Sequence, residues 1–345
     1  MAQRKMLFAY IGKTNNGVDY YQNNYVSLCD EFPEVTDFII CLSSNYNQVG
    51  AQSTSGYDAV ISGGNSEVNL VACTNVLKVK EKPFYVALPP VNVSSKSGTG
   101  SYSIEYQNWK TYLTKVRTAL TNNGSWSLCK GFYLVNEMIP GTINQNSIMS
   151  NTFAKLLNDI AYVIRSDTNL NYCREFIWAP YLGYNANFMD FNSDNGIIAN
   201  RTNIFDMVLF QPHTYFAPAE GEWNPTSYSG TPPENSRLAA KCAIENVAYT
   251  YAAKNDRNHY KIVAGSKTSP TKIGVDVELD HNLFQLDNPT LRESYINSYN
   301  AQCDGLEGVV GSDAPLVFYC GSGDTQIQAA DAIHRFFRDG TSVYA

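Results

Sequence analysis

The sequence contains few charged residues and lacks the features that mark several common functional classes. Only 17% of its 345 residues are charged, and the net charge is −7. This argues against a nucleic-acid partner, because phosphates attract a basic surface. No apolar run reaches the roughly 18 residues that a membrane-spanning helix needs, so we expect no membrane partner. The first glycine-containing turn, Gly12–Gly17, matches neither the dinucleotide-binding fingerprint nor the P-loop.

The eight cysteines lack the spacing of a metal site. None occurs as Cys-x-x-Cys, so we expect no zinc site of the usual kind and no other metal or cofactor. Most lie in apolar contexts, which favours buried free thiols, although the even count allows one or two disulfides in a secreted protein. Tyr, Asn, Ser and Thr supply most of the polarity. This composition suits a secreted or cell-surface protein, its leader peptide removed, that handles neutral polar ligands such as sugars.

Apolar segments that alternate with helical patterns run the length of the chain. Eight of these segments have the character of buried strands: Met6–Ile11, Asp37–Leu42, Pro83–Leu88, Gly131–Val135, Glu175–Ala179, Ile204–Phe210, Ile273–Leu279 and Pro315–Tyr319. A further strand-like piece, Tyr57–Ser62, is expected to elaborate the second unit.

Helical spacing fills most of the intervals between these strands. The expected helices are Tyr25–Phe32, Ser66–Lys80, Ile104–Thr121, Ser147–Arg165, Arg237–Ala253, Thr290–Cys303 and Ala329–Arg338. Eight strands interleaved with helices predict an α/β fold, a (β/α)8 TIM barrel, rather than an open doubly wound sheet. No linker of low complexity interrupts the pattern, so we expect residues 1–345 to form a single barrel domain with elaborated loops.

Polar residues follow directly on the fourth predicted strand, at Asn136 and Glu137. A barrel binds its ligands at the carboxyl ends of its strands, so these two side chains are expected at the mouth. Ionisable groups are rarely left in such a position without a partner or a task. Glu137 is therefore a candidate catalytic carboxylate.

Acidic and apolar residues alternate on the seventh predicted strand. Side chains on a strand point alternately to its two faces, so Asp276, Glu278 and Asp280 are expected to face the barrel axis. Three like charges on one inner face raise each other's pKa and need a partner, a ligand or a metal. The alternative is a half-exposed edge strand with a solvated face.

Carboxylates on strands four and seven of one barrel face each other across its mouth, which is the arrangement that glycoside hydrolysis requires. The chain resembles the large clan of retaining barrel glycosidases in this respect. We expect Glu137 to be the acid/base and Glu278 the nucleophile, acting on a polysaccharide or oligosaccharide. Two alternatives remain: a non-catalytic carbohydrate-binding barrel, and a hydrolase or lyase that holds Ca²⁺, Mg²⁺ or Mn²⁺ with the strand-seven carboxylates and His213.

Four motifs resemble those of an uncharacterised bacterial family of the DUF4855 type. They are Gly131-Phe-Tyr…Glu137, Ile177-Trp-Ala-Pro-Tyr181, Phe210-Gln-Pro-His-Thr-Tyr-Phe216 and Gly274-Val-Asp-Val-Glu-Leu-Asp280. The departures from the family pattern are Leu134 for Trp, His213 for Asn and Asp276 for Glu. The last departure favours Glu278 over Asp276 as nucleophile. The resemblance implies a barrel and a site at these strand ends rather than a particular substrate.

Aromatic and amide side chains near the same strand ends suit a sugar site. Planar rings can stack on pyranose faces while amides and imidazoles bind hydroxyl groups. The expected substrate-binding residues, with Asp276 and Asp280, are Asn136, Trp178, Tyr181, Gln211, His213, Tyr215, Trp223 and Tyr319. Core packing is the alternative for each ring, above all for Trp178 and Tyr319.

Overall fold

The protein is described by a computed structural model in the parts of the chain that carry its central sheet and several of the helices around it. The residues described are 3–13, 19–20, 22–42, 54–63, 69–90, 99–137, 152–166, 174–180, 204–211, 271–279, 289, 292–293, 295–296, 299, 314–320 and 330–339. Among the helices of this part, none is long and apolar enough to cross a membrane.

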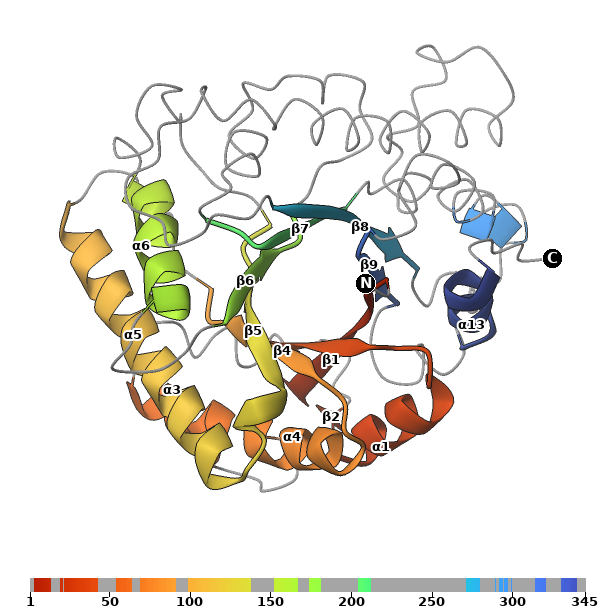
Figure 1. The fold of residues 1–345 in the computed structure, drawn as a ribbon, viewed down its shortest axis with the longest axis horizontal. Helices are drawn as coiled ribbons and strands as arrows, with labels where there is room; N and C mark the ends of the chain where they lie inside the picture. Colours follow the sequence, from red (N-terminus) through yellow and green to blue (C-terminus); the bar gives the residue numbers. More distant parts are fainter. Residues whose placement is uncertain are drawn as a thin grey trace, which may run out of the picture.

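Eight parallel strands close into a barrel, because the first strand pairs with both the second and the last. Figure 1 shows the ring of strands with helices outside it. The eight strands are β1 (Lys5–Lys13), β3 (Asp37–Leu42), β4 (Phe84–Leu88), β5 (Cys129–Leu134), β6 (Glu175–Trp178), β7 (Met207–Phe210), β8 (Lys272–Glu278) and β9 (Leu316–Tyr319). A two-residue strand, β2 (Asp19–Tyr20), adds to β1 in antiparallel. The predicted (β/α)8 fold is confirmed.

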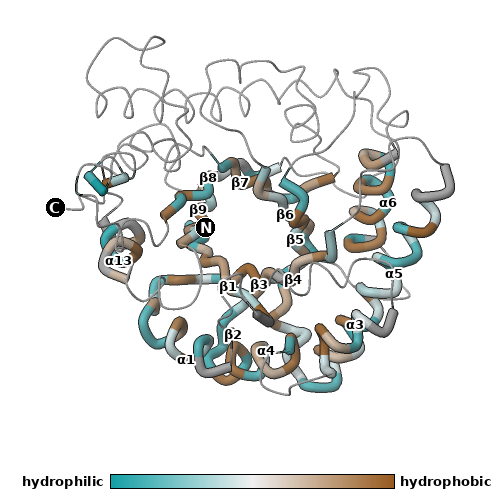
Figure 2. Tube along the Cα trace, turned by 180° about the vertical axis from the view of Figure 1, so that it is seen from behind, coloured by the Kyte–Doolittle hydropathy of each residue, from teal (hydrophilic) through white to brown (hydrophobic). Residues whose placement is uncertain are grey.

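Helices cover the outside of the ring and bury one face each against it. They are α1 (Gln22–Glu31), α3 (Thr54–Ile61), α4 (Leu70–Val79), α5 (Thr99–Asn122), α6 (Thr152–Ser166) and α13 (Ala330–Asp339), with a 3-10 turn η1 (Trp126–Leu128). Apolar and polar residues alternate along these helices in Figure 2, as expected of helices with one covered face. The α4 helix begins after Asn69, whose side chain accepts a hydrogen bond from the backbone N–H of Ala72.

The segment expected as a strand at Tyr57–Ser62 is a helix, so that prediction was wrong. Tyr57, Val60 and Ile61 are all buried, and they recur at spacings of three and four, which is the helical period. The helix α3 packs on α5, where the rings of Tyr57 and Tyr112 meet edge to face at 5.2 Å. Backbone bonds from Ser62 and Gly63 to the carbonyl of Asp58 end it.

Strand register determines which side chains enter the barrel. On β8 and β9, Asp276 pairs with Val317 and Glu278 pairs with Tyr319. The intervening Phe318 packs outward against Phe337 of α13, with ring centroids 6.1 Å apart. Paired residues of neighbouring strands point to the same face, so Asp276 and Glu278 face the interior, as the alternation of the sequence predicts.

Two inward positions admit only glycine. A Cβ atom built on Gly131 would lie 2.0 Å from the carbonyl oxygen of Glu175, and one on Gly274 would lie 1.9 Å from that of Pro315. Both distances are far below any allowed contact with backbone. These glycines let neighbouring strands approach closely at the amino-terminal part of the barrel.

A bonded ion pair occupies the interior at the amino-terminal ends of the strands. The guanidinium of Arg4 donates to both carboxylate oxygens of Glu175, at 2.6 and 3.1 Å, and the hydroxyl of Tyr85 bonds to the same groups. Burial by itself would raise the pKa of Glu175, but the hydrogen bonds and charge of Arg4, aided by Tyr85, outweigh it and lower the pKa. We call this set, Arg4, Tyr85 and Glu175, the lower ion pair.

Candidate active site

Three carboxyl groups lie at the opposite end of the barrel, where the strands finish. Glu278 is the last residue of β8 and is 3% exposed, Asp276 lies two residues before it and is 2% exposed, and Glu137 follows β5 and is exposed. Burial raises the pKa of Asp276 well above its usual value, and the charges of Glu278 and Glu137 raise it further. We call these three residues the upper acid cluster.

Two neutral side chains inside the barrel interact with this cluster. Burial raises the pKa of the Cys41 thiol, and the charges of Asp276 and Glu137 add to that effect. Burial is also the largest cause of the raised pKa of the Tyr133 phenol. Cys41 and the same two carboxyl groups raise that pKa further. Cys41 on β3 and Tyr133 on β5 are therefore near enough to Asp276 and Glu137 to interact with them electrostatically.

Aromatic rings fill the interior next to this group. The ring of Phe8, on β1, meets Tyr133 edge to face at 5.5 Å and meets Tyr319 at 6.2 Å. The carboxyl groups thus sit against an apolar barrel interior, which explains why burial is the largest cause of the raised pKa at Asp276.

The electrostatic environment of the cluster is acidic. Among the described residues, Oδ1 of Asp276 has no hydrogen-bond partner, while the backbone of Tyr319 donates a bond to the carboxyl group. No group of three or more His, Cys, Asp or Glu side chains in the described ranges has an arrangement that could hold a metal ion. Two of the residues expected in the metal-binding alternative, His213 and Asp280, lie outside those ranges.

Trp178 does not line the barrel interior. It lies on the outer face of β6, is fully buried, and stacks on Phe205 with ring centroids 5.0 Å apart. Its indole N–H donates to the carbonyl of Asn136 at 2.7 Å. No face of the ring is left for a sugar. Trp178 instead supports the backbone of the residue that precedes Glu137.

The structure brings some of the other expected binding residues to the mouth. Gln211, directly after β7, is buried, and its amide donates to the carbonyl of Ala179 at 2.9 Å. Asn136 is half-buried beside Glu137, and Tyr319 is half-buried at the end of β9. Tyr181, Tyr215 and Trp223, like His213 and Asp280, fall outside the described residues.

Reasoning from strand ends alone missed Cys41, Tyr133 and Phe8. Tyr133 lies within the predicted strand Gly131–Val135, but that run is apolar on both faces, so alternation alone does not show that Tyr133 points inward. The register between strands was needed to align Cys41 and Phe8 with the upper acid cluster, and register is not visible in a single sequence.

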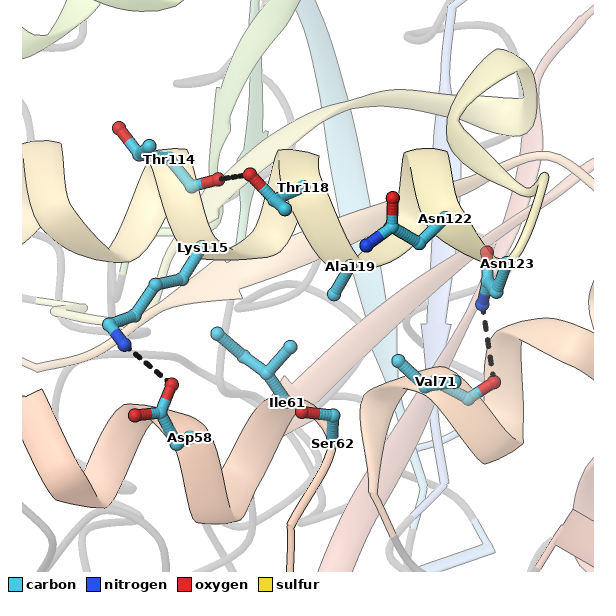
Figure 3. Close-up of a pocket in the computed structure, with 10 residues that line it drawn as sticks. All are labelled: Asp58, Ile61, Ser62, Val71, Thr114, Lys115, Thr118, Ala119, Asn122 and Asn123. Carbon is cyan, nitrogen blue, oxygen red and sulfur yellow. Dashed lines mark hydrogen bonds and ion pairs between the residues drawn. The ribbon is translucent and has the colours of Figure 1, made fainter.

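A separate pocket of about 540 Å³ opens on the outside of the barrel, between α3, α4 and α5 (Figure 3). Several of its lining residues bond to one another. Lys115 pairs with Asp58 at 2.6 Å, and Asn123 donates to the carbonyl of Val71 at 3.4 Å. Helices separate this pocket from the upper acid cluster, so it adds nothing to the chemistry there.

Comparisons with known proteins support the fold. No protein-family model matches the chain, and a search of curated proteins finds no match. Among solved structures, a mannanase from Bacillus subtilis is similar with a TM-score of 0.50 and 11% identity over 99% of this chain and 87% of the mannanase chain. This likeness shows the (β/α)8 fold alone.

Two further similar structures have lower scores. A psychrophilic glycoside hydrolase family 10 endo-β-1,4-xylanase has a TM-score of 0.45 at 9% identity, covering 92% of this chain and 87% of its own. The PgaB (BpsB) glycoside hydrolase domain from Bordetella bronchiseptica has a TM-score of 0.46 at 11% identity, covering 100% of both chains.

Proposed function

We propose that this protein is a retaining glycoside hydrolase, with Glu137 as the acid/base and Glu278 as the nucleophile. The observation that carries the proposal is the upper acid cluster, in which carboxyl groups from β8 and from the end of β5 interact at the carboxyl-terminal mouth of a (β/α)8 barrel. The substrate would be a polysaccharide or oligosaccharide, and the protein would meet it outside the cell or at the cell surface.

The different surroundings of the two glutamates fit their proposed roles. Glu278 is nearly excluded from water, so its carboxylate would attack the anomeric carbon without competing hydration. Glu137 is exposed, so it can protonate the leaving oxygen, release the aglycone to solvent and then take a proton from the incoming water. A retaining mechanism predicts that the two carboxyl groups approach to about 5–5.5 Å when substrate is bound.

Hydrolysis by wild type, Glu137→Gln and Glu278→Gln tests the proposal on a panel of polysaccharides and aryl glycosides. Glu278→Gln should abolish turnover on every substrate, because it removes the nucleophile. Glu137→Gln should lose about 10²–10⁴-fold in kcat on polysaccharides, the usual contribution of general acid catalysis. Its loss should be smaller on aryl glycosides whose leaving group needs no proton.

Glu31→Gln provides a matched control, because Glu31 is an exposed glutamate at the end of α1. The anomer first formed, followed by NMR, distinguishes retention from inversion. Full activity in either site variant would refute its assignment. Glycan binding without hydrolysis by wild type would favour a binding barrel instead.

A further inference from the structure

Asp276 is a buried carboxyl group to which the proposed reaction assigns no step. It precedes Glu278 by two residues on the inner face of β8, so their Cα atoms are about 6.6 Å apart along the strand. Only 2% of Asp276 is exposed, and one of its oxygens, Oδ1, has no hydrogen-bond partner among the described residues. A carboxylate in this position would carry an uncompensated charge inside the barrel.

The groups that face Asp276 in the described part of the chain offer it no positive charge. Glu278 lies on its own strand, Glu137 and Tyr133 approach from β5, and Cys41 approaches from β3. The backbone of Tyr319 on β9 supplies one hydrogen bond, which favours the charged form but is outweighed by burial and by the neighbouring acids.

Two carboxylates so close in an apolar interior cannot both ionise easily, and one proton is then shared between them. Asp276 is the deeper of the two along β8, whereas Glu278 ends the strand beside the exposed Glu137. Both side chains are almost fully buried, at 2% and 3% exposed, so it is the position along β8 that favours the charge on Glu278, at the mouth, over Asp276, deeper in the barrel.

We propose that Asp276 is a positioning residue that keeps its proton at neutral pH, so that the negative charge of this acid pair stays on Glu278. Its role in catalysis rests on the proposed function, which makes Glu278 the nucleophile, but its protonation does not. A neutral Asp276 leaves Glu278 as the anion that can attack, without a second charge nearby to raise the pKa of either glutamate.

Infrared spectroscopy of the wild type tests the protonation directly. The C=O band of a protonated carboxylic acid should persist at pH 7, and it should shift when the aspartate carboxyl carbons, but not the glutamate ones, are labelled with ¹³C. The band should vanish in Asp276→Asn and remain in Glu278→Gln. If the band vanished in Glu278→Gln and not in Asp276→Asn, the proton would lie on Glu278 and the proposal would be overturned. An Asp276→Asn spectrum that keeps the band unchanged would also overturn it.

Thermal unfolding across pH gives a second readout that requires no activity. A carboxyl whose folded-state pKa is raised contributes stability that is complete below its unfolded pKa and is lost as pH rises toward the folded value. The Tm of Asp276→Asn relative to wild type should therefore increase between pH 5 and pH 8. A Tm difference that stays constant or decreases over this range would contradict a protonated Asp276.

The pH profile of kcat/KM connects the residue to the reaction. The acid limb of this profile is set by Glu278. It should stay in place in Asp276→Asn, because Asp276 is already neutral in that pH range. Any change in kcat/KM should be confined to the alkaline limb. If Asp276 were charged, its replacement would move the acid limb to lower pH, a shift that a merely structural role would not cause. Absence of glycan hydrolysis by wild type would refute the proposed function but leave the infrared and thermal results to decide the proton's location.

Discussion

The pKa of an acid inside the ring is shifted in opposite directions at the two ends of the barrel. At the amino-terminal end, Glu175 lies inside the ring with a bidentate Arg4 and the hydroxyl of Tyr85, and its pKa is lowered. At the carboxyl-terminal end, Asp276 lies inside the same ring among other acids, and its pKa is raised. Burial acts in the same direction at both ends. The direction of the pKa shift is decided by whether a guanidinium lies beside the acid. A paired acid suits a stabilising role, and an unpaired one suits proton transfer or nucleophilic attack.

Removal of Arg4 should produce the largest effect, because it would make the lower end resemble the upper one. Arg4→Met leaves Glu175 inside the barrel without its cation, and we expect a loss of about 2–3 kcal/mol in the free energy of unfolding. Denaturant unfolding at pH 7 measures it. The expected value is below that of a fully buried pair, since the Arg4 and Glu175 side chains are 25% and 33% exposed.

The double variant Arg4→Met/Glu175→Gln serves as the control, and it should recover part of that loss. The cost of Arg4→Met should also shrink in acid. A carboxyl whose folded pKa is lowered contributes stability above its unfolded pKa, near 4.5, and that stability is lost as pH falls through the folded value. A cost that is independent of pH would show that Arg4 acts through packing rather than charge.

The same chemical change at the two ends should alter stability with opposite sign. Glu175→Gln leaves a partly buried guanidinium with a weaker partner, and should cost about 1–2 kcal/mol at pH 7. Asp276→Asn replaces a carboxyl group whose charged form would destabilise the folded protein, and it should raise the Tm at the same pH. Calorimetry of the two variants beside wild type measures both. Destabilisation in both would show that the upper carboxyl group, like the lower one, is stabilised in its charged form.

The smallest effect is expected outside the ring, at an ion pair whose cation can lose its proton. His334 of α13 contacts Glu34 at 2.5 Å and Glu31 at 3.5 Å, next to α1. Burial by itself would lower the pKa of His334, but the two glutamates together raise it above 6.5. This stability is complete below pH 6.5 and is lost as pH rises through the folded pKa.

We therefore expect His334→Gln to cost less than about 1 kcal/mol at pH 5.5 and close to nothing at pH 9. Urea unfolding at the two pH values measures the difference. A cost at pH 9 as large as that at pH 5.5 would show that His334 acts through packing rather than through its charge.

Much of the fold can be predicted from the sequence because a parallel barrel buries both faces of its strands. Such strands appear as continuous apolar runs, and the predicted run at Asp37–Leu42 coincides with β3. The misassigned segment, Tyr57–Ser62, is a short apolar run that lies in a helix outside the ring of strands. Periodicity over so few residues does not distinguish a strand from one and a half turns of helix.

The candidate site was less accessible to prediction, for a different physical reason. Alternation along one strand gives the inward direction of Asp276 and Glu278, but the neighbours of these residues come from strands far apart in the chain. Which level of β3 or β5 lies opposite depends on register, and register is set by packing across the whole ring. Trp178 was predicted to bind substrate, with core packing as the alternative, because an aromatic residue at a strand end can stack either on a ligand or on a neighbouring ring. In the structure it stacks on Phe205.

The buried thiols can report the order in which parts of the protein open. Cys29, Cys41, Cys73, Cys129 and Cys320 are all buried, on elements from α1 to the end of β9. Burial raises the pKa of Cys29 to about 11 and that of Cys73 to about 12, so neither forms an appreciable thiolate at neutral pH while the protein stays folded. An alkylating reagent can modify each of these thiols only when the segment that buries it opens, so peptide mass spectrometry of the alkylated protein would record the order in which those segments open.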